Sequence, residues 1–161
     1  MQHSPARLTR VSDKEAVRVG LVGTSWWAEA MYLPALANHP IGRITAVCGR
    51  DLDRAQNVAT QWSIPQAYSD WSKMIDSGEF DAIIVASPNE THYEITMAAL
   101  DRGLPVLCEK PLGMNVAEAH KMAEAAHQSF VQANNLGFGD KMIPSLFEAQ
   151  EKTNNVKIIP R

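Results

Sequence analysis

Short runs of apolar residues that alternate with helical patterning constrain the fold of this chain more than any other feature. Four of these runs are expected to form strands, at 17–22, 44–48, 81–86 and 104–108, with a very short further strand at 66–68. A strand that is apolar throughout is buried on both faces, and helices between such strands indicate a parallel sheet covered on both sides. The sequence therefore predicts an α/β fold, a doubly wound parallel sheet (Rossmann fold) forming a single three-layer domain.

The intervening segments predict helices and place the loops between them. The expected helices lie at about 26–38, 53–62, 70–77, 91–102 and 115–130. Asp53 is the expected N-cap of the second helix and Gly103 the expected C-cap of the fourth. Right-handed crossovers place every strand-to-helix loop on one edge of the sheet, where open α/β sheets bind their ligands. The loops expected to line one crevice there are 24–27, 49–51, 87–89 and 109–111.

The first of these loops has the composition of a phosphate-binding turn. The first strand reaches Gly23 and is followed without a break by a helix that begins at Trp26. Dinucleotide-binding domains place a pyrophosphate on this arrangement, because the free N–H groups and the dipole of the helix N-terminus favour an anion. The match to G-x-G-x-x-G/A is imperfect, with Ser25 at the second glycine position and Ala28 at the last. Taken alone, the pattern also fits an ordinary βα turn without a ligand.

Composition excludes several classes of function. The chain has 161 residues, of which 45% are apolar, as expected for one soluble domain. A net charge of −3 without a basic run argues against a nucleic-acid partner. No apolar run approaches the ~20 residues that a membrane helix requires, so no membrane partner is expected. Residues 1–16 are polar without an apolar centre, and we interpret them as a flexible N-terminal extension rather than a secretory signal.

The two cysteines indicate the compartment. Cys48 and Cys108 are expected at strand ends, in a chain without an export signal, which favours a reducing, cytoplasmic location. We interpret both as small apolar packing residues. No further ligands lie at metal spacing from them, so no metal site is predicted.

Three motifs occur in order along the chain: Val17-Arg18-Val19-Gly20-Leu21-Val22-Gly23, then Ser87-Pro88-Asn89 followed by Thr91-His92, then Glu109-Lys110-Pro111-Leu112. With them the chain resembles the Gfo/Idh/MocA family of NAD(P)-dependent oxidoreductases over about residues 17–150, and the Glu-Lys-Pro triplet is the most specific element. The resemblance implies an enzyme that acts on CH–OH groups. It would transfer hydride between a nicotinamide and a hydroxyl or carbonyl carbon of a sugar, cyclitol or related metabolite.

The resemblance also implies roles for individual residues. Lys110 would lie beside the nicotinamide and help to hold the substrate oxygen, and His92 is the second catalytic candidate, although a histidine at a helix start also fits a capping or packing role. Glu109 would contact the cofactor ribose, and Pro111 would shape the turn, often after a cis bond in relatives. The residues expected at the cofactor are Gly23, Thr24, Ser25, Trp26, Trp27, Gly49, Arg50, Ser87, Pro88, Asn89, Glu109 and Lys110.

The end of the second strand bears on the choice of cofactor. An acidic residue there accepts from the ribose 2′-OH of NAD, whereas an arginine accommodates the 2′-phosphate of NADP. Gly49 leaves room at this point and Arg50 supplies a fork of donors. We therefore expect NADP(H) to be preferred. Asp51 keeps NAD(H) possible, since it is either an acid near the ribose or a simple turn residue.

The end of the chain departs from the family pattern. Residues 17–139 are expected to form the dinucleotide-binding domain, including a sixth strand at 136–138, and 140–161 a linking helix and the start of a truncated second domain. In relatives that second domain supplies much of the substrate pocket, so the isolated chain is expected to bind cofactor with little or no turnover. The alternative is a catalytically silent NADP(H)-binding module, or a truncated subunit that acts through a partner chain. The edge strand expected at 157–159 makes a homo-oligomer possible.

Overall fold

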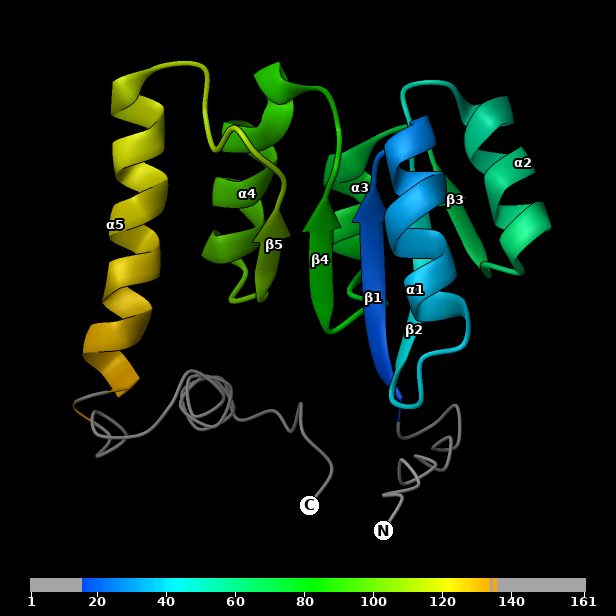
Figure 1. The fold of residues 1–161 in the computed structure, drawn as a ribbon, viewed down its shortest axis with the longest axis horizontal. Helices are drawn as coiled ribbons and strands as arrows, with labels where there is room; N and C mark the ends of the chain where they lie inside the picture. The colour runs from blue at the N-terminus through cyan, green and yellow to red at the C-terminus, as the bar shows by residue number, and fades with distance from the viewer. Residues whose placement is uncertain (1–15, 134, 136–161) are drawn as a thin grey trace, which may run out of the picture.

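A single parallel sheet organises the described part of the chain. The computed structural model describes residues 16–133 and 135. Its strands are β1 (Val17–Val22), β2 (Gly42–Cys48), β3 (Gln66–Tyr68), β4 (Ala82–Val85) and β5 (Val106–Cys108). They pair in the order β3-β2-β1-β4-β5, and every pair is parallel (Figure 1). The predicted doubly wound Rossmann fold is confirmed.

The helices follow the strands as the patterning predicts. They are η1 (Ala28–Tyr32), α1 (Leu33–Ala37), α2 (Leu52–Trp62), α3 (Trp71–Ser77), η2 (Asn89–Thr91), α4 (His92–Asp101) and α5 (Val116–Ala133). Two expected caps were wrong by one or two positions. Asp51, not Asp53, is the N-cap of α2, because its backbone is extended and its carboxylate accepts from the N–H of Arg54, whereas Asp53 already lies in the first helical turn. The C-cap of α4 is Arg102, and Gly103 follows it with a φ of +72°.

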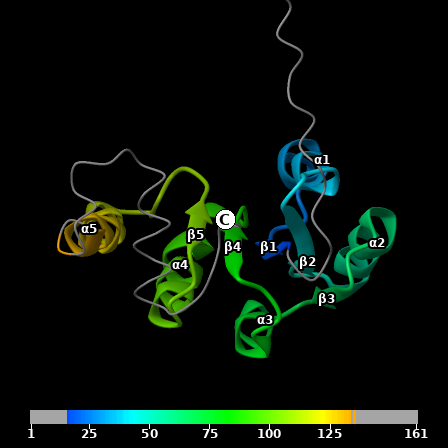
Figure 2. The same cartoon turned by 90° about the horizontal axis from the view of Figure 1, so that it is seen from below.

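Two apolar cores, one on each face of the sheet, join these layers. On one face, Leu21 and Val47 pack with Leu33 of α1 and Val58 of α2. On the other face, a core of strand residues packs with α3 and α4; its members include Val22, Ala46, Met74, Ile83, Val85 and Ile95. Figure 2 shows α1 on one side of the sheet and α3 and α4 on the other. Both cores contain residues of β1 and β4, the neighbouring strands whose carboxyl ends lead into the Gly23 and Ser87 loops.

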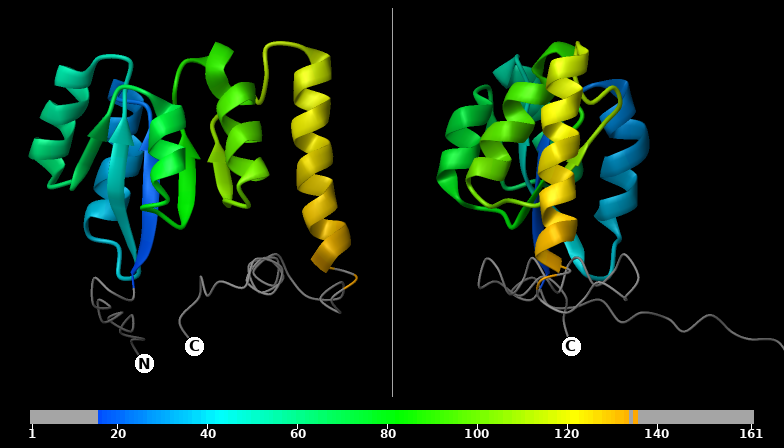
Figure 3. Two further views of the ribbon diagram at one scale, coloured as in Figure 1. Left: turned by 180° about the vertical axis from the view of Figure 1, so that it is seen from behind. Right: turned by 90° about the vertical axis from the view of Figure 1, so that its left-hand side faces the viewer.

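Helix α5 lies at the β5 end of the sheet, beside α4. The ammonium of Lys121 on α5 stands 5.9 Å from the ring centre of Tyr93 on α4. Figure 3 shows α5 running the full height of the domain next to the sheet layers. Within the part of the chain that the structure describes, no helix is long and apolar enough to cross a membrane.

Several predictions about the ends of the chain lie outside the described residues. These are the N-terminal extension, the sixth strand at 136–138, the linking helix and the edge strand at 157–159. The predicted domain boundaries therefore stay predictions.

Candidate cofactor-binding site

A cavity of about 470 Å³ opens at the carboxyl ends of the strands. It brings together seven of the residues predicted to hold a cofactor: Gly23, Thr24, Ser25, Gly49, Arg50, Ser87 and Pro88. Residues from β1, β2 and β4 loops thus meet at one place, as the crossover rule predicts. The other predicted residues do not line this cavity; they are Trp26, Trp27, Asn89, His92, Glu109 and Lys110.

Gly23 is required by the close approach of β1 and β4. Its φ is +134°, and a Cβ added to it would lie 2.3 Å from the carbonyl oxygen of Ala86. The Gly23 N–H meanwhile donates to the carbonyl of Cys48, at 2.8 Å. The glycine therefore lets the loop pass over the ends of three adjacent strands, where any side chain would collide with backbone.

Gly49 has a different reason to lack a side chain. A Cβ added there would lie 2.7 Å from Oγ1 of Thr24, so the threonine side chain fills the space beside this glycine. We expected Gly49 to leave room for the cofactor, but the side chain of Thr24 in the first loop occupies that space. The loop after β2 and the loop after β1 are packed against one another at this point.

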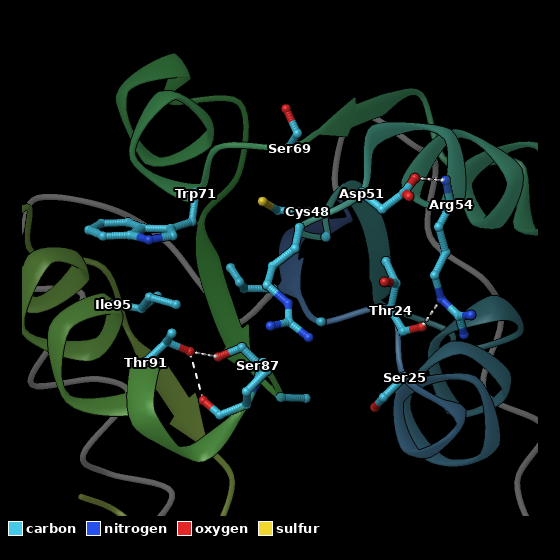
Figure 4. A pocket seen from close by; sticks show the side chains of 16 residues that line it. Thr24, Ser25, Cys48, Asp51, Arg54, Ser69, Trp71, Ser87, Thr91 and Ile95 are labelled. Carbon is cyan, nitrogen blue, oxygen red and sulfur yellow. Dashed lines mark hydrogen bonds between the residues drawn. The ribbon is translucent and has the colours of Figure 1, made fainter. Parts of the chain in front are cut away.

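Arg54 was missed by the sequence reasoning. Its Nε donates to the carbonyl of Thr24 at 2.7 Å (Figure 4). Its Nη2 lies 3.3 Å from a carboxylate oxygen of Glu29. The guanidinium lines the cavity and ties α2 to the glycine turn. Its partners lie 25 and 30 residues away in the sequence and give no local signal.

The opposite wall of the cavity is apolar. Trp71, at the start of α3, and Ile95 of α4 line it, and Figure 4 shows both across the cavity from Thr24 and Ser25. Cys48 also lines it, and burial raises the pKa of its thiol to about 12, so the group stays a neutral thiol. A flat aromatic wall facing a polar loop suits a ligand with one stacking end and one charged end.

Ser87 presents a hydrogen-bond acceptor to the site. Its Oγ lies 2.7 Å from Oγ1 of Thr91, which itself donates to the carbonyl of Pro88 at 2.7 Å (Figure 4). A hydroxyl carries one hydrogen, so Thr91 has none left and Ser87 must be the donor between them. The lone pairs of Ser87 then remain for a donor such as a ribose hydroxyl.

His92 is buried behind these loops, with only 1% of its surface exposed. Its Nδ1 lies 2.7 Å from the carbonyl of Pro111 and its Nε2 lies 2.8 Å from the carbonyl of Ser87. The ring therefore bridges the loop after β4 and the turn after β5. This position gives it contact with backbone and not with open solvent.

The turn after β5 carries the Glu-Lys-Pro triplet. The Lys110–Pro111 peptide bond is cis and the Lys110 side chain is exposed. The Glu109 carboxylate accepts from Tyr32 Oη at 2.5 Å and from Trp27 Nε1 at 2.8 Å, and both bonds lower the pKa of this carboxyl. Burial first, and then the Glu109 carboxylate, raise the pKa of Tyr32 to about 12. Tyr32 was also missed by the sequence reasoning.

Comparison with known proteins decides the family. Residues 17–135 match the Gfo/Idh/MocA model, described as an oxidoreductase family with an NAD-binding Rossmann fold. The chain belongs to this family. The predicted resemblance is confirmed, and the described domain is the NAD(P)-binding domain of Gfo/Idh/MocA oxidoreductases.

Individual relatives include inositol dehydrogenases. The chain is 36% identical over 110 residues to scyllo-inositol 2-dehydrogenase (NADP(+)) IolU of Bacillus subtilis, covering 68% of this chain and 33% of the relative. It is 31% identical over 138 residues to inositol 2-dehydrogenase 4 of Saccharopolyspora erythraea, covering 86% and 40%. The structure of myo-inositol 2-dehydrogenase from Lactobacillus plantarum matches with a TM-score of 0.65 and 28% identity, covering 70% of this chain and 33% of that one. The chain thus spans about a third of the length of such relatives.

Proposed function

We propose that this Gfo/Idh/MocA domain binds NADP(H) in preference to NAD(H), and that it serves hydride transfer at a CH–OH carbon of a sugar, cyclitol or related small polyol. One observation carries the cofactor preference. Arg50 is exposed and lines the cavity, while its neighbour Asp51 uses one carboxylate oxygen to cap α2. The cation is available for a 2′-phosphate, and one oxygen of the acid that would favour a free 2′-hydroxyl is held by the cap of α2.

The chemistry of the cavity fits a dinucleotide. Gly23 brings bare backbone to the ends of the strands, and the helix that follows begins with N–H groups that have no acceptor within the helix. Ser87 offers lone pairs to a ribose hydroxyl, and Trp71 offers an aromatic face to a base. These groups are arranged from polar to apolar across one cavity, which supports binding of a ligand that has a charged part and a stacking base.

The proposed chemistry at the triplet relies on Lys110. When bound, a nicotinamide dinucleotide supplies the hydride donor or acceptor. The ammonium of Lys110 would hold the substrate oxygen and stabilise negative charge that develops on it. Glu109, fixed by two donors, would accept from a ribose hydroxyl. The names of the inositol dehydrogenase relatives support a polyhydroxylated substrate.

A second proposal is that the chain is a catalytically silent NADP(H)-binding module, or a subunit that acts through a partner chain. It is supported by the position of Glu109 and Lys110, which do not line the cavity. Steady-state reduction of NADP⁺ with a panel of cyclitols and sugars separates the two proposals. Turnover that disappears in Lys110→Ala supports the oxidoreductase, whereas tight cofactor binding without turnover supports the module.

Calorimetric titration with NADPH and NADH tests the cofactor preference. We expect NADPH to bind at least about tenfold more tightly, a difference of ~1.4 kcal/mol. Arg50→Ala should weaken NADPH by about 10- to 100-fold, the loss of charge-assisted hydrogen bonds, and leave NADH nearly unchanged. Arg102→Ala is the matched control, because this arginine pairs with Asp76 at the far end of α4. Tighter binding of NADH than of NADPH would overturn the preference.

A further inference from the structure

The helix after the glycine turn is not a regular α-helix. Residues Ala28–Tyr32 form a π-helical turn, η1, in which the N–H of Leu33 donates to the carbonyl of Ala28, five residues back. Such turns are rare and occur often at functional sites. This π-helical turn lies close to the candidate phosphate loop, and the contacts of its side chains should explain its geometry.

The contacts of Trp27 and Tyr32 give that reason. In an α-helix, residues five positions apart point about 140° away from each other. Here both side chains reach the same oxygen, Oε1 of Glu109, with Trp27 Nε1 at 2.8 Å and Tyr32 Oη at 2.5 Å. The wider π-helical turn brings the two donors onto one face, so that they converge on a single carboxylate.

The same carboxylate also contacts the backbone of the triplet. Its other oxygen, Oε2, lies 3.2 Å from the N–H of Lys110, and the N–H of Glu109 donates to the carbonyl of Val85 in β4. Glu109 is therefore fixed to β4 through its backbone and to η1 through its side chain. One carboxylate joins the helix that follows the glycine turn to the turn that carries Lys110.

We propose that Trp27 and Tyr32 are positioning residues that hold Lys110 through Glu109, and that they link occupation of the phosphate loop to the position of Lys110. The proposal rests on the proposed function, because it takes the cofactor diphosphate to bind at the N-terminus of this helix. A shift of that helix end moves Trp27 and Tyr32 together, and both are bonded to the carboxylate beside Lys110. The link needs no contact between Lys110 and the phosphate loop.

The ionisation states fix which group donates and which accepts in this network. Tyr32 and Trp27 lower the pKa of Glu109, so the carboxylate stays charged, while the pKa of Tyr32 is raised and its hydroxyl stays a donor. Hydrogen bonds to an ionised acceptor are about twice as strong as neutral ones. Tyr32 therefore acts as a permanent donor and not as an acid or base in the reaction.

Indole N–H signals in ¹H–¹⁵N spectra of the full chain test the network first. The chain has four tryptophans, and Trp27→Phe assigns the signal of interest. That signal should follow the titration of Glu109 at acid pH and lose its pH dependence in Glu109→Gln. Tyr32→Phe, which removes the strongest donor, should raise the midpoint of this titration. Tyr68→Phe is the matched control, because Tyr68 also points its hydroxyl at a glutamate, Glu79, at 3.4 Å and away from the site.

Addition of NADPH to the same samples tests the link itself. In the wild type we expect the backbone N–H signals of both Ser25 and Lys110 to shift. In Tyr32→Phe the shift at Ser25 should remain and the shift at Lys110 should fall by at least half. Equal shifts at Lys110 in Tyr32→Phe and Tyr68→Phe would overturn the proposal while leaving the proposed function intact. If NADPH does not bind, the proposed function and the link both fail, and the acid titration still shows whether the network exists.

Discussion

Replacement of Gly23 by alanine tests the reasoning about the glycine turn. A Cβ there would lie 2.3 Å from the Ala86 carbonyl oxygen and 2.6 Å from its carbon, and the φ of +134° is one that alanine rarely adopts. Backbone strain of this kind costs about 1–3 kcal/mol, and forced overpacking costs a further ~1–3 kcal/mol. We therefore expect the free energy of unfolding to fall by about 2–6 kcal/mol, a large part of the ~5–15 kcal/mol typical of a domain.

The assay is urea unfolding followed by circular dichroism, with Gly78→Ala as the matched control. Gly78 also has a positive φ, +64°, but a Cβ there would meet nothing within 4 Å. It should therefore cost only the left-handed strain, about 1–2 kcal/mol. The difference between the two variants isolates the clash with the β4 backbone. If Gly23→Ala loses no more stability than Gly78→Ala, the clash has been relieved by movement of the loop, and the argument for an obligatory glycine is refuted.

Two further predictions concern groups that hold the sheet and its loops. Burial raises the pKa of Asp81, but the bonds from Arg18 outweigh it, so the pKa is lowered overall. The ion pair should therefore stabilise the fold fully at pH values above the usual aspartate pKa. This stabilisation is lost as the pH falls through the lowered pKa of Asp81. Because the pair is exposed, we expect it to contribute about 0.5–1 kcal/mol. Asp81→Asn should remove this part of the pH dependence in urea titrations at pH 2–5, and an unchanged pH profile would contradict the assignment. His92→Leu should cost about 1–3 kcal/mol, because the buried ring loses its contacts with the carbonyls of Ser87 and Pro111 and with them one N–H donor. Urea unfolding measures this cost, and a loss below ~0.5 kcal/mol would show that water replaces the ring.

The sequence predicted the strands and the shared edge because both depend on local pattern. Apolar runs specify buried parallel strands, and crossover handedness then fixes where the loops meet. The correction from Asp53 to Asp51 at the start of α2 shows the limit of this reasoning. Both aspartates can cap a helix, and only the extended backbone at Asp51 decides between them.

The contacts that connect the loops could not be predicted in the same way. Tyr32 and Glu109 are 77 residues apart, and their bond depends on a π-helical turn that the composition of Ala28–Tyr32 does not indicate. Arg54 and His92 likewise contact backbone carbonyls of other loops, those of Thr24 and Pro111. Backbone acceptors are present at every residue, so a sequence gives no sign of which one a side chain will reach.

The bonds made by Arg54, His92 and Glu109 share one property: each starts on one loop or helix and ends on another. Hydrogen bonds between neighbouring loops and helices therefore hold this edge of the sheet together. Exchanging one loop alone would break its bonds to another. An engineer who grafts the Glu-Lys-Pro turn onto another scaffold must transfer Tyr32, Trp27 and His92 with it.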